Sequence, residues 1–204
     1  MFKIYGMYTP MFNKVVLVAE ELGADFEVID VDLIKGETRT PEHLKRHLFG
    51  KVPVLEHNGE FIFESNAIIR YMANVSTSNL YPSDNLKKAK VDQWMDYFTI
   101  QAGKWLTTIW FENCIAPNYF DREADQKVVA EAQEYLLEVM PKIDSHLDTN
   151  KYLAGSELSL ADLNAFVLMR GYKEAKLNLD DFRNFTRWFD QIDSLESVKK
   201  TWKA

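Results

Sequence analysis

The sequence predicts an α/β domain followed by an all-helical domain. Three observations predict this division. Strand and helix signals alternate through roughly the first 75 residues, an Asn-Gly pair separates two apolar runs, and only helical periodicity continues beyond a polar linker. The 204 residues are 47% hydrophobic and 27% charged, which excludes a disordered chain or a coiled coil. We place the first domain at residues 1–77 and the second at 84–204, with a Ser-, Thr- and Pro-containing linker between them.

The first domain reads as strand, helix, strand, short helix, hairpin and helix. Asn58-Gly59 lies between the apolar runs 52–55 and 61–63, and Asn-Gly between such runs is the strongest short signal of a hairpin. The helix that follows has apolar residues on one face, and we expect Ser65 to cap it. This order predicts a small mixed sheet that carries helices.

The second domain shows helical spacing throughout. A set of mostly aromatic or apolar residues recurs at spacings of four, three, four and four, which predicts one face of a long helix: Trp94, Phe98, Gln101, Trp105 and Ile109. A second helix is expected over about 122–147. Ser159 and Asp162 form a variant of the capping box, with Asp in place of Glu, and therefore predict the start of another helix. A final helix around 185–195 closes the domain.

Charge and cysteine content exclude several classes of protein. The 31 acidic and 24 basic residues give a formal net charge of −7, which opposes an extended phosphate-binding face, so we expect no nucleic-acid partner. Cys114 is the single cysteine, and the four histidines lack the spacing of metal ligands. No apolar run approaches the ~20 residues that span a bilayer, and the start of the sequence lacks the pattern of a signal peptide. We therefore expect a cytoplasmic protein with no metal and no membrane partner.

Two positions in the first domain predict contacts with a small ligand. Pro53 cannot donate to a central ladder, so it belongs at a strand start; a cis form would expose the preceding backbone to an extended ligand, and a trans form would be an ordinary strand entrance. Glu64 and Ser65 stand where a strand gives way to a helix. Free helix amides there would bind a carboxylate and Glu64 an ammonium, which suits an α-amino acid; the alternative is a helix cap beside a solvated glutamate.

The start of the first helix is a further candidate site. Thr9 suits the cap and Pro10 the first helical position, and both could serve helix initiation alone. A hydroxyl beside free helix amides would also hold an anion such as a thiolate, and Tyr8 is the adjacent competitor for that role. Aromatic residues of the long helix are either core groups or the lining of an apolar groove. The candidate groove residues are Met11, Phe12, Trp105 and Trp110.

These pieces together resemble the cytosolic glutathione transferases over essentially the whole chain. Gly50–Leu55 is similar to the cis-proline segment of that family, and Phe63–Ile68 to its Glu-Ser motif. Tyr152–Gly155, followed by Ser159–Asp162, resembles the folding box of its helical domain. The resemblance implies a thioredoxin-like N-terminal domain and an all-helical C-terminal domain, of a serine-type class similar to the plant or bacterial ones.

The resemblance also implies roles for residues around these motifs. Val52 would pair its backbone with the cysteinyl part of glutathione, with Pro53 cis. Glu64 and Ser65 would hold the γ-glutamyl end of the tripeptide. The γ-glutamyl end carries a carboxylate and an ammonium group on one carbon, as does the α-amino acid that Glu64 and Ser65 suit.

The glycyl end and the catalytic position are implied in the same way. Lys51 matches a basic or amide position near the tripeptide, and Arg39 matches a lysine that meets the glycyl carboxylate. Thr38 stands where the same classes often have histidine, so that contact is not carried over. The catalytic serine of the family lies five residues before an Arg-Val pair. Lys14-Val15 matches that pair here, and the same count back gives Thr9, with Tyr8 as the alternative.

The implied activity is conjugation of the glutathione thiolate to small apolar electrophiles. The resemblance further implies a role in detoxification, a homodimer, and glutathione as co-substrate with no cofactor. Phe49 matches a position that often inserts into the neighbouring subunit, and packing under its own loop is the alternative. A second hypothesis is a non-catalytic assembly or regulatory domain, because Arg39–Glu42 and Glu64–Ile68 also resemble the gamma subunit of a eukaryotic translation elongation factor.

Overall fold

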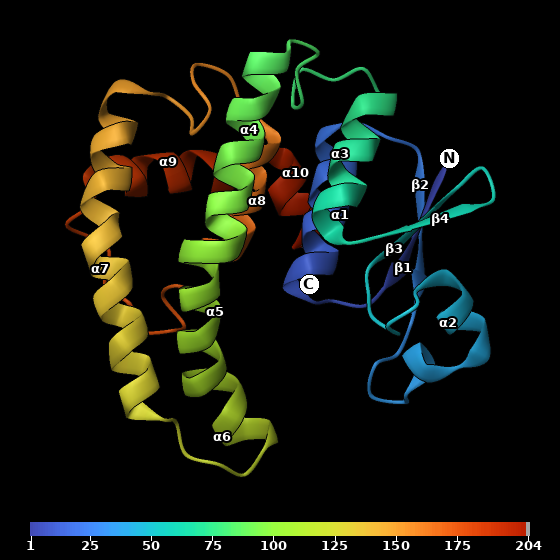
Figure 1. Ribbon diagram of the computed structural model, residues 1–204, viewed down its shortest axis with the longest axis horizontal. Helices are drawn as coiled ribbons and strands as arrows, with labels where there is room; N and C mark the ends of the chain where they lie inside the picture. The colour runs from blue at the N-terminus through green and yellow to red at the C-terminus, as the bar shows by residue number, and fades with distance from the viewer. Residues whose placement is uncertain (203–204) are drawn as a thin grey trace. The chain divides into compact units, whose positions relative to one another are not determined.

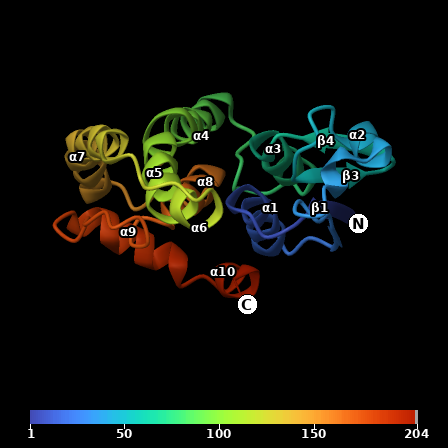
Figure 2. The same ribbon diagram turned by 90° about the horizontal axis from the view of Figure 1, so that it is seen from below.

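The computed structural model describes residues 1–202, which form two compact units (Figure 1; Figure 2). The first unit consists of residues 1–82 and 194–202, and the second of residues 83–193. This boundary differs from the predicted one, which left the C-terminal segment in the helical domain. Helix α10 (Glu196–Thr201) packs on α1 (Pro10–Glu21), where Ser197 Oγ donates to a carboxylate oxygen of Glu21 at 2.5 Å.

The first unit is built on a four-stranded mixed sheet, with strand order β2-β1-β3-β4. β1 and β2 are parallel, and β3 runs antiparallel to both β1 and β4. Helices α1 and α3 lie on one side of the sheet and α2 on the other (Figure 1; Figure 2). The elements are β1 (Phe2–Gly6), α1, β2 (Phe26–Asp30), a 3₁₀ turn (Glu37–Arg39), α2 (Pro41–Arg46), β3 (Val54–His57), β4 (Glu60–Phe63), α3 (Ser65–Val75) and α10.

Local signals explain most of the boundaries in this unit. Asn58 and Gly59 have φ of 55° and 83°, as a two-residue hairpin turn of type I′ requires, so the predicted hairpin is confirmed. Thr9 caps α1, because its Oγ1 accepts the N–H of Phe12 at 3.3 Å. Thr40 caps α2 in the same way, through the N–H of His43.

The start of α3 differs from the prediction. Glu64, with φ of 69°, occupies the cap position without a side-chain capping bond, and Ser65 is the first helical residue. The turn after β4 places Glu64 in the left-handed region, so the helix begins immediately after it. The Ser65 hydroxyl is directed instead to Met11 of α1, where it donates to Sδ at 3.6 Å.

The second unit contains six α-helices among the described residues, and π-helical turns interrupt the first long run. The turn Phe98–Ala102 inserts an extra residue per turn, so Ala102 and Leu106 are buried while Gln101, part of the predicted stripe, is exposed. A second π turn spans Phe111–Ile115. The helices are α4 (Asn85–Tyr97), α5 (Gly103–Trp110), α6 (Ala116–Tyr119), α7 (Gln126–Thr149), α8 (Leu160–Met169) and α9 (Arg183–Asp193).

A buried carboxylate organises the start of α8. Asp162 is fully buried and accepts four hydrogen bonds: from the N–H of Leu153 at 2.8 Å, the N–H and Oγ of Ser159 at 3.0 and 2.8 Å, and Trp188 Nε1 at 2.9 Å. The predicted capping box is therefore confirmed. The same carboxylate also joins the loop before α8 to α9.

Asp162→Ala should lower the free energy of unfolding by about 3–5 kcal/mol, because it leaves several buried donors without an acceptor. Urea denaturation at neutral pH measures this change. Asp148→Ala, at an exposed position on α7, should change the same quantity by no more than about 0.5 kcal/mol. A loss below about 1 kcal/mol for Asp162→Ala would show that the network is not a main source of stability.

Candidate functional site

The register of the sheet brings three candidate segments to one edge. Tyr5, near the end of β1, pairs with Val54 at the start of β3, and Val54 pairs with Phe63 at the end of β4. The turn after β1, the loop before β3 and the turn after β4 therefore leave the sheet side by side. These are the segments that hold Thr9, Val52-Pro53 and Glu64-Ser65, which sequence reasoning selected separately.

Thr9 and Tyr8 occupy different environments at the start of α1. Thr9 is half-buried, and its Oγ1 accepts a hydrogen bond from the backbone, which leaves the hydroxyl proton to be donated. Tyr8 is 72% exposed and lines a cavity of about 170 Å³ together with Asp30 of β2 and Thr201 of α10. Met11, in contrast, contacts α3 through Ser65. The start of α1 thus has two sides. Tyr8 is on the side that faces β2 and α10, and Met11 is on the side that faces the first turn of α3.

The Val52–Pro53 peptide bond is cis, as the resemblance implied. Within residues 1–202, neither the N–H nor the C=O of Val52 has a hydrogen-bond partner in the protein. Lys51 is exposed, and so is Arg39, whose Nη1 donates to the carbonyl oxygen of Phe49 at 3.3 Å. The Val52 backbone can therefore pair with an extended peptide. The two cationic side chains, Lys51 and Arg39, belong to the same or a neighbouring segment.

A buried lysine of α1 contacts the first turn of α3. Lys14 of α1 is 1% exposed, and its Nζ donates to Asn66 Oδ1 at 2.5 Å. Burial, with a contribution from the charge of Arg70, lowers the pKa of Lys14 to about 7 against the opposing effect of Glu64. Sequence reasoning used Lys14 only to count back to Thr9. Lys14 stands among apolar residues on one face of a predicted helix, and this position in the sequence could have identified it as a buried lysine near the site.

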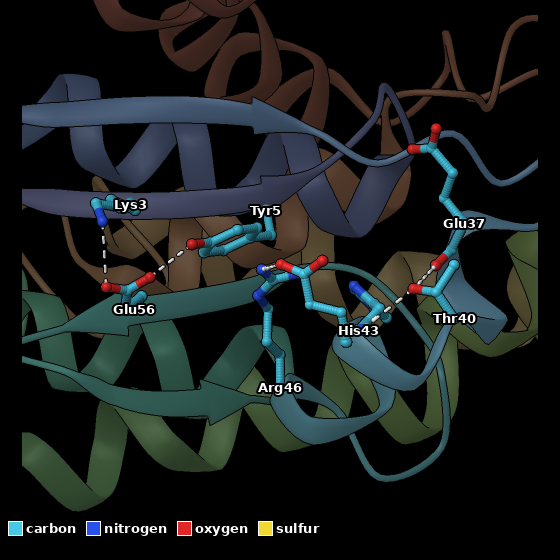
Figure 3. Close-up of polar contacts among 8 residues, drawn as sticks. Lys3, Tyr5, Glu37, Thr40, His43, Arg46 and Glu56 are labelled. Atoms are coloured by element: carbon cyan, nitrogen blue, oxygen red, sulfur yellow. Dashed lines mark hydrogen bonds and ion pairs between the residues drawn. The ribbon is translucent and has the colours of Figure 1, made fainter.

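Helix α2 is held on the opposite side of the sheet by a polar cluster (Figure 3). The guanidinium of Arg46 lies 4.5 Å from the ring centre of Tyr5 and also donates to Glu42. Tyr5 OH donates to Glu56 at 2.5 Å, and Lys3 Nζ forms an ion pair with the same carboxylate at 3.2 Å. Burial and the bond to Glu56 raise the pKa of Tyr5 to about 12, so its hydroxyl stays protonated as a donor.

The residues expected to form an apolar groove divide between the two units. Met11 is half-buried at the start of α1. Phe12 is only 3% exposed, and its ring packs on Gly6, where a Cβ would lie 2.4 Å from Phe12 Cδ2. Phe12 is thus a core residue that offers little surface to a ligand, which differs from the expectation. Trp105 and Trp110 are half-buried on α5 of the second unit; the ring of Trp105 lies 5.3 Å from that of Tyr135.

No group of three or more His, Cys, Asp or Glu side chains among residues 1–202 is arranged to hold a metal ion. Over the same residues, none of the helices combines the length and the apolar character needed to cross a bilayer.

Comparison with known proteins gives a consistent result. The family models described as glutathione S-transferase, N-terminal domain, and glutathione S-transferase, C-terminal domain, match residues 1–74 and 99–196. Glutathione S-transferase 1 of Zea mays is 37% identical over 202 residues, which cover 97% of this chain and 94% of the relative. The probable glutathione S-transferase GSTF2 of Oryza sativa subsp. japonica is 34% identical, with 97% of this chain and 94% of the relative covered.

Solved structures show the same similarity. Glutathione S-transferase I from maize, in complex with an atrazine glutathione conjugate, superimposes with a TM-score of 0.92 at 32% identity, covering 98% of this chain and 95% of that one. A structure of glutathione S-transferase-I bound with lactoylglutathione gives a TM-score of 0.91 at 32% identity, covering 98% and 97%.

Lys14→Met should change how stability depends on pH. The pKa of Lys14 is about 7 in the folded state and near 10.5 in the unfolded chain, so between these values the unfolded state binds a proton that the folded state lacks. The contribution of Lys14 to the free energy of unfolding therefore rises with pH across this window. Urea titrations should show the difference between wild type and Lys14→Met rising by up to about 1.4 kcal/mol per pH unit between about pH 7.5 and 9.5.

The matched control is Lys45→Met on α2, where the lysine is exposed. The difference between wild type and this variant should stay flat over the same pH range. A flat difference for Lys14→Met as well would contradict a buried amine with a lowered pKa.

Proposed function

Because the chain belongs to the glutathione S-transferase family, we propose that it conjugates the thiolate of glutathione to small apolar electrophiles. The observation that carries this proposal is the meeting of three segments at one sheet edge, through the pairing of Tyr5, Val54 and Phe63. Two helix starts and an unpaired stretch of backbone are thereby available to one small ligand. Family membership supplies the identity of that ligand.

Each part of glutathione has a complementary group in the first unit. The α-carboxylate of the γ-glutamyl end suits the first amides of α3 and the hydroxyl of Ser65, with Glu64 for its ammonium group. The cysteinyl backbone suits the unpaired N–H and C=O of Val52. The glycyl carboxylate suits the exposed cations of Arg39 and Lys51. In this arrangement the sulfur lies toward the start of α1.

Thr9 is the group that we assign to thiol activation. A thiol with a pKa of ~8.5 is about 3% ionised at pH 7, and lowering that pKa by about two units requires ~2.7 kcal/mol of preferential thiolate stabilisation. One hydrogen bond to an anion contributes ~1.5–3 kcal/mol and a helix terminus ~0.3–1 kcal/mol. The Oγ1 of Thr9 already accepts from Phe12 N–H, so its proton is directed away from the helix and can be donated to sulfur. Tyr8 lines the cavity toward β2, which favours Thr9 over Tyr8.

The electrophile is proposed to bind through apolar groups. In the first unit Met11 is half-buried and keeps surface for such a partner, whereas Phe12 does not. Two solved relatives hold an atrazine glutathione conjugate and lactoylglutathione, and we propose that this chain likewise releases glutathione conjugates. The reaction uses glutathione as co-substrate and requires no cofactor. We also propose a detoxifying role in the cytoplasm.

Thr9→Ala should lower kcat/KM for conjugation of glutathione to a chromogenic aryl halide about 10- to 100-fold at pH 7, because the thiolate loses one charge-assisted hydrogen bond. Thr9→Ser keeps the hydroxyl and should retain most of the activity. Tyr8→Phe is the matched control and should leave the rate within about twofold of wild type.

The same assay distinguishes an enzyme from an assembly domain. Isothermal titration should show glutathione binding to the wild type, and turnover should accompany it; binding without turnover would favour the non-catalytic hypothesis. If neither Thr9→Ala nor Tyr8→Phe slows the reaction, the activating group lies elsewhere.

The chain is also proposed to form a homodimer. Phe49 is 57% exposed at the tip of the loop before β3, with its ring edge-on to Phe63 at 6.2 Å. An exposed aromatic group of this kind suits a pocket on a second copy of the chain. Phe49→Ala should therefore shift sedimentation from dimer toward monomer at micromolar concentration.

The control is Leu33→Ala, also at an exposed loop position, which should leave the dimer intact. An unchanged dimer for Phe49→Ala would mean that Phe49 packs only against its own loop.

A further inference from the structure

The loop that leads to Pro53 is attached to the segment before it at two backbone carbonyls. Arg39 Nη1 donates to the carbonyl oxygen of Phe49 at 3.3 Å. His43 Nε2 lies 2.9 Å from the carbonyl oxygen of Lys51. Both side chains come from the region of α2, so the position of the loop depends on that region.

Gly50 brings the two segments into direct contact between these bonds. It has φ of 58°, and a Cβ at this position would lie 2.6 Å from the carbonyl oxygen of Thr38 and 3.1 Å from Arg39 Nη1. Only glycine accommodates both the backbone conformation and the close approach. The loop is therefore seated on the segment that precedes it.

The chemistry of His43 determines what its contact does. The side chain is 1% exposed, and a carbonyl oxygen can only accept, so Nε2 carries the proton and donates to Lys51. Within residues 1–202, Nδ1 has no hydrogen-bond partner. The bond to Lys51 is then the polar contact that orients the ring. The backbone behind it is anchored, because Thr40 caps α2 and Arg46 holds the helix against Tyr5 (Figure 3).

The carbonyl of Lys51 and the N–H of Val52 belong to the same peptide group. Because that group is planar, a hydrogen bond that holds the carbonyl on one side also fixes the direction of the N–H on the other side. The N–H of Val52 is one of the backbone groups that the proposed function assigns to the cysteinyl part of glutathione. His43 is thus linked to the ligand through one rigid unit.

We propose that His43 is a positioning residue for glutathione: its Nε2–H holds the Lys51 carbonyl and thereby aims the Val52 N–H at the tripeptide. This inference rests on the proposed function. The hydrogen bond of His43 goes to the Lys51 carbonyl, whereas the Thr9 hydroxyl accepts from Phe12, so the effect of His43 belongs to glutathione binding.

His43→Phe should raise KM for glutathione about tenfold, because the peptide group loses its fixed orientation. The kcat at saturating substrates and the KM for the aryl halide should stay within about twofold of wild type. A residue that merely stabilised the fold would change none of these constants selectively. His43→Gln, whose amide N–H can donate to the same carbonyl, should restore KM for glutathione to within about threefold of wild type.

His57→Phe is the matched control. His57 lies on the hairpin, where its Nδ1 is 2.8 Å from the hydroxyl oxygen of Tyr71, so its replacement removes a bond of the same type elsewhere in the unit. It should leave KM for glutathione unchanged. An equal KM for His43→Phe and His57→Phe would overturn the role of His43.

Nitrogen chemical shifts of the His43 ring in the wild-type protein provide a test that needs no variant to fold. They should show the Nε2–H tautomer, and an Nδ1–H tautomer would overturn the inference. Failure of the wild type to bind glutathione in calorimetry would instead overturn the proposed function. Normal wild-type binding together with an unaffected His43→Phe would overturn the role of His43 alone.

Discussion

The pairing of β3 between β1 and β4 is the constraint on which the candidate site depends. Val54 has Tyr5 on one side and Phe63 on the other, so the three neighbouring chain segments leave the sheet at the same edge. Side chains and backbone groups from distant parts of the sequence are collected there. A shift of register by one residue would replace Val54 as the partner of Tyr5 and Phe63 and would change which segments meet at this edge, so the register fixes the site.

Positive potential accumulates at this edge. The N-terminal ends of α1 and α3, which carry the positive ends of the helix dipoles, lie at this edge, and the buried amine of Lys14 on α1 donates to Asn66 on α3. Burial of the amine disfavours its charge, which is the reason for its lowered pKa. Glu64 offsets part of the potential at the same place. A ligand that carries both a carboxylate and an ammonium group matches such a mixture better than a simple anion does.

Support for the site extends to the far side of the sheet. Helix α2 has only six residues, too few to be stable without tertiary contacts. Its contacts form a continuous path: Lys3 and Tyr5 hold Glu56 on the sheet, Arg46 packs over Tyr5, and His43 reaches the loop before Pro53. The polar cluster of Figure 3 therefore belongs to the mechanical support of the ligand-binding edge, although none of its carboxylates faces that ligand in the proposed function.

Features that depend on a few neighbouring residues were determined by the sequence itself. The hairpin at Asn58-Gly59, the caps Thr9 and Thr40 and the box of Ser159 and Asp162 each require only a local turn or a bond within one helical turn, so their residue types suffice to predict them. The motifs that resemble a known family also predicted that a thioredoxin-like domain comes first and a helical domain follows it.

Packing between distant segments decided the remainder. The π turn at Phe98–Ala102 shifted the buried face of a correctly predicted helix, and contact with α1 moved α10 into the first unit. Phe12 became a core residue because Gly6 leaves space for its ring, and Lys14 became a buried amine that donates to Asn66 of α3. Whether a side chain is buried or hydrogen-bonded depends on the segment that packs against it as well as on its own helix or strand. A local sequence pattern specifies its own element and not the segment that covers it.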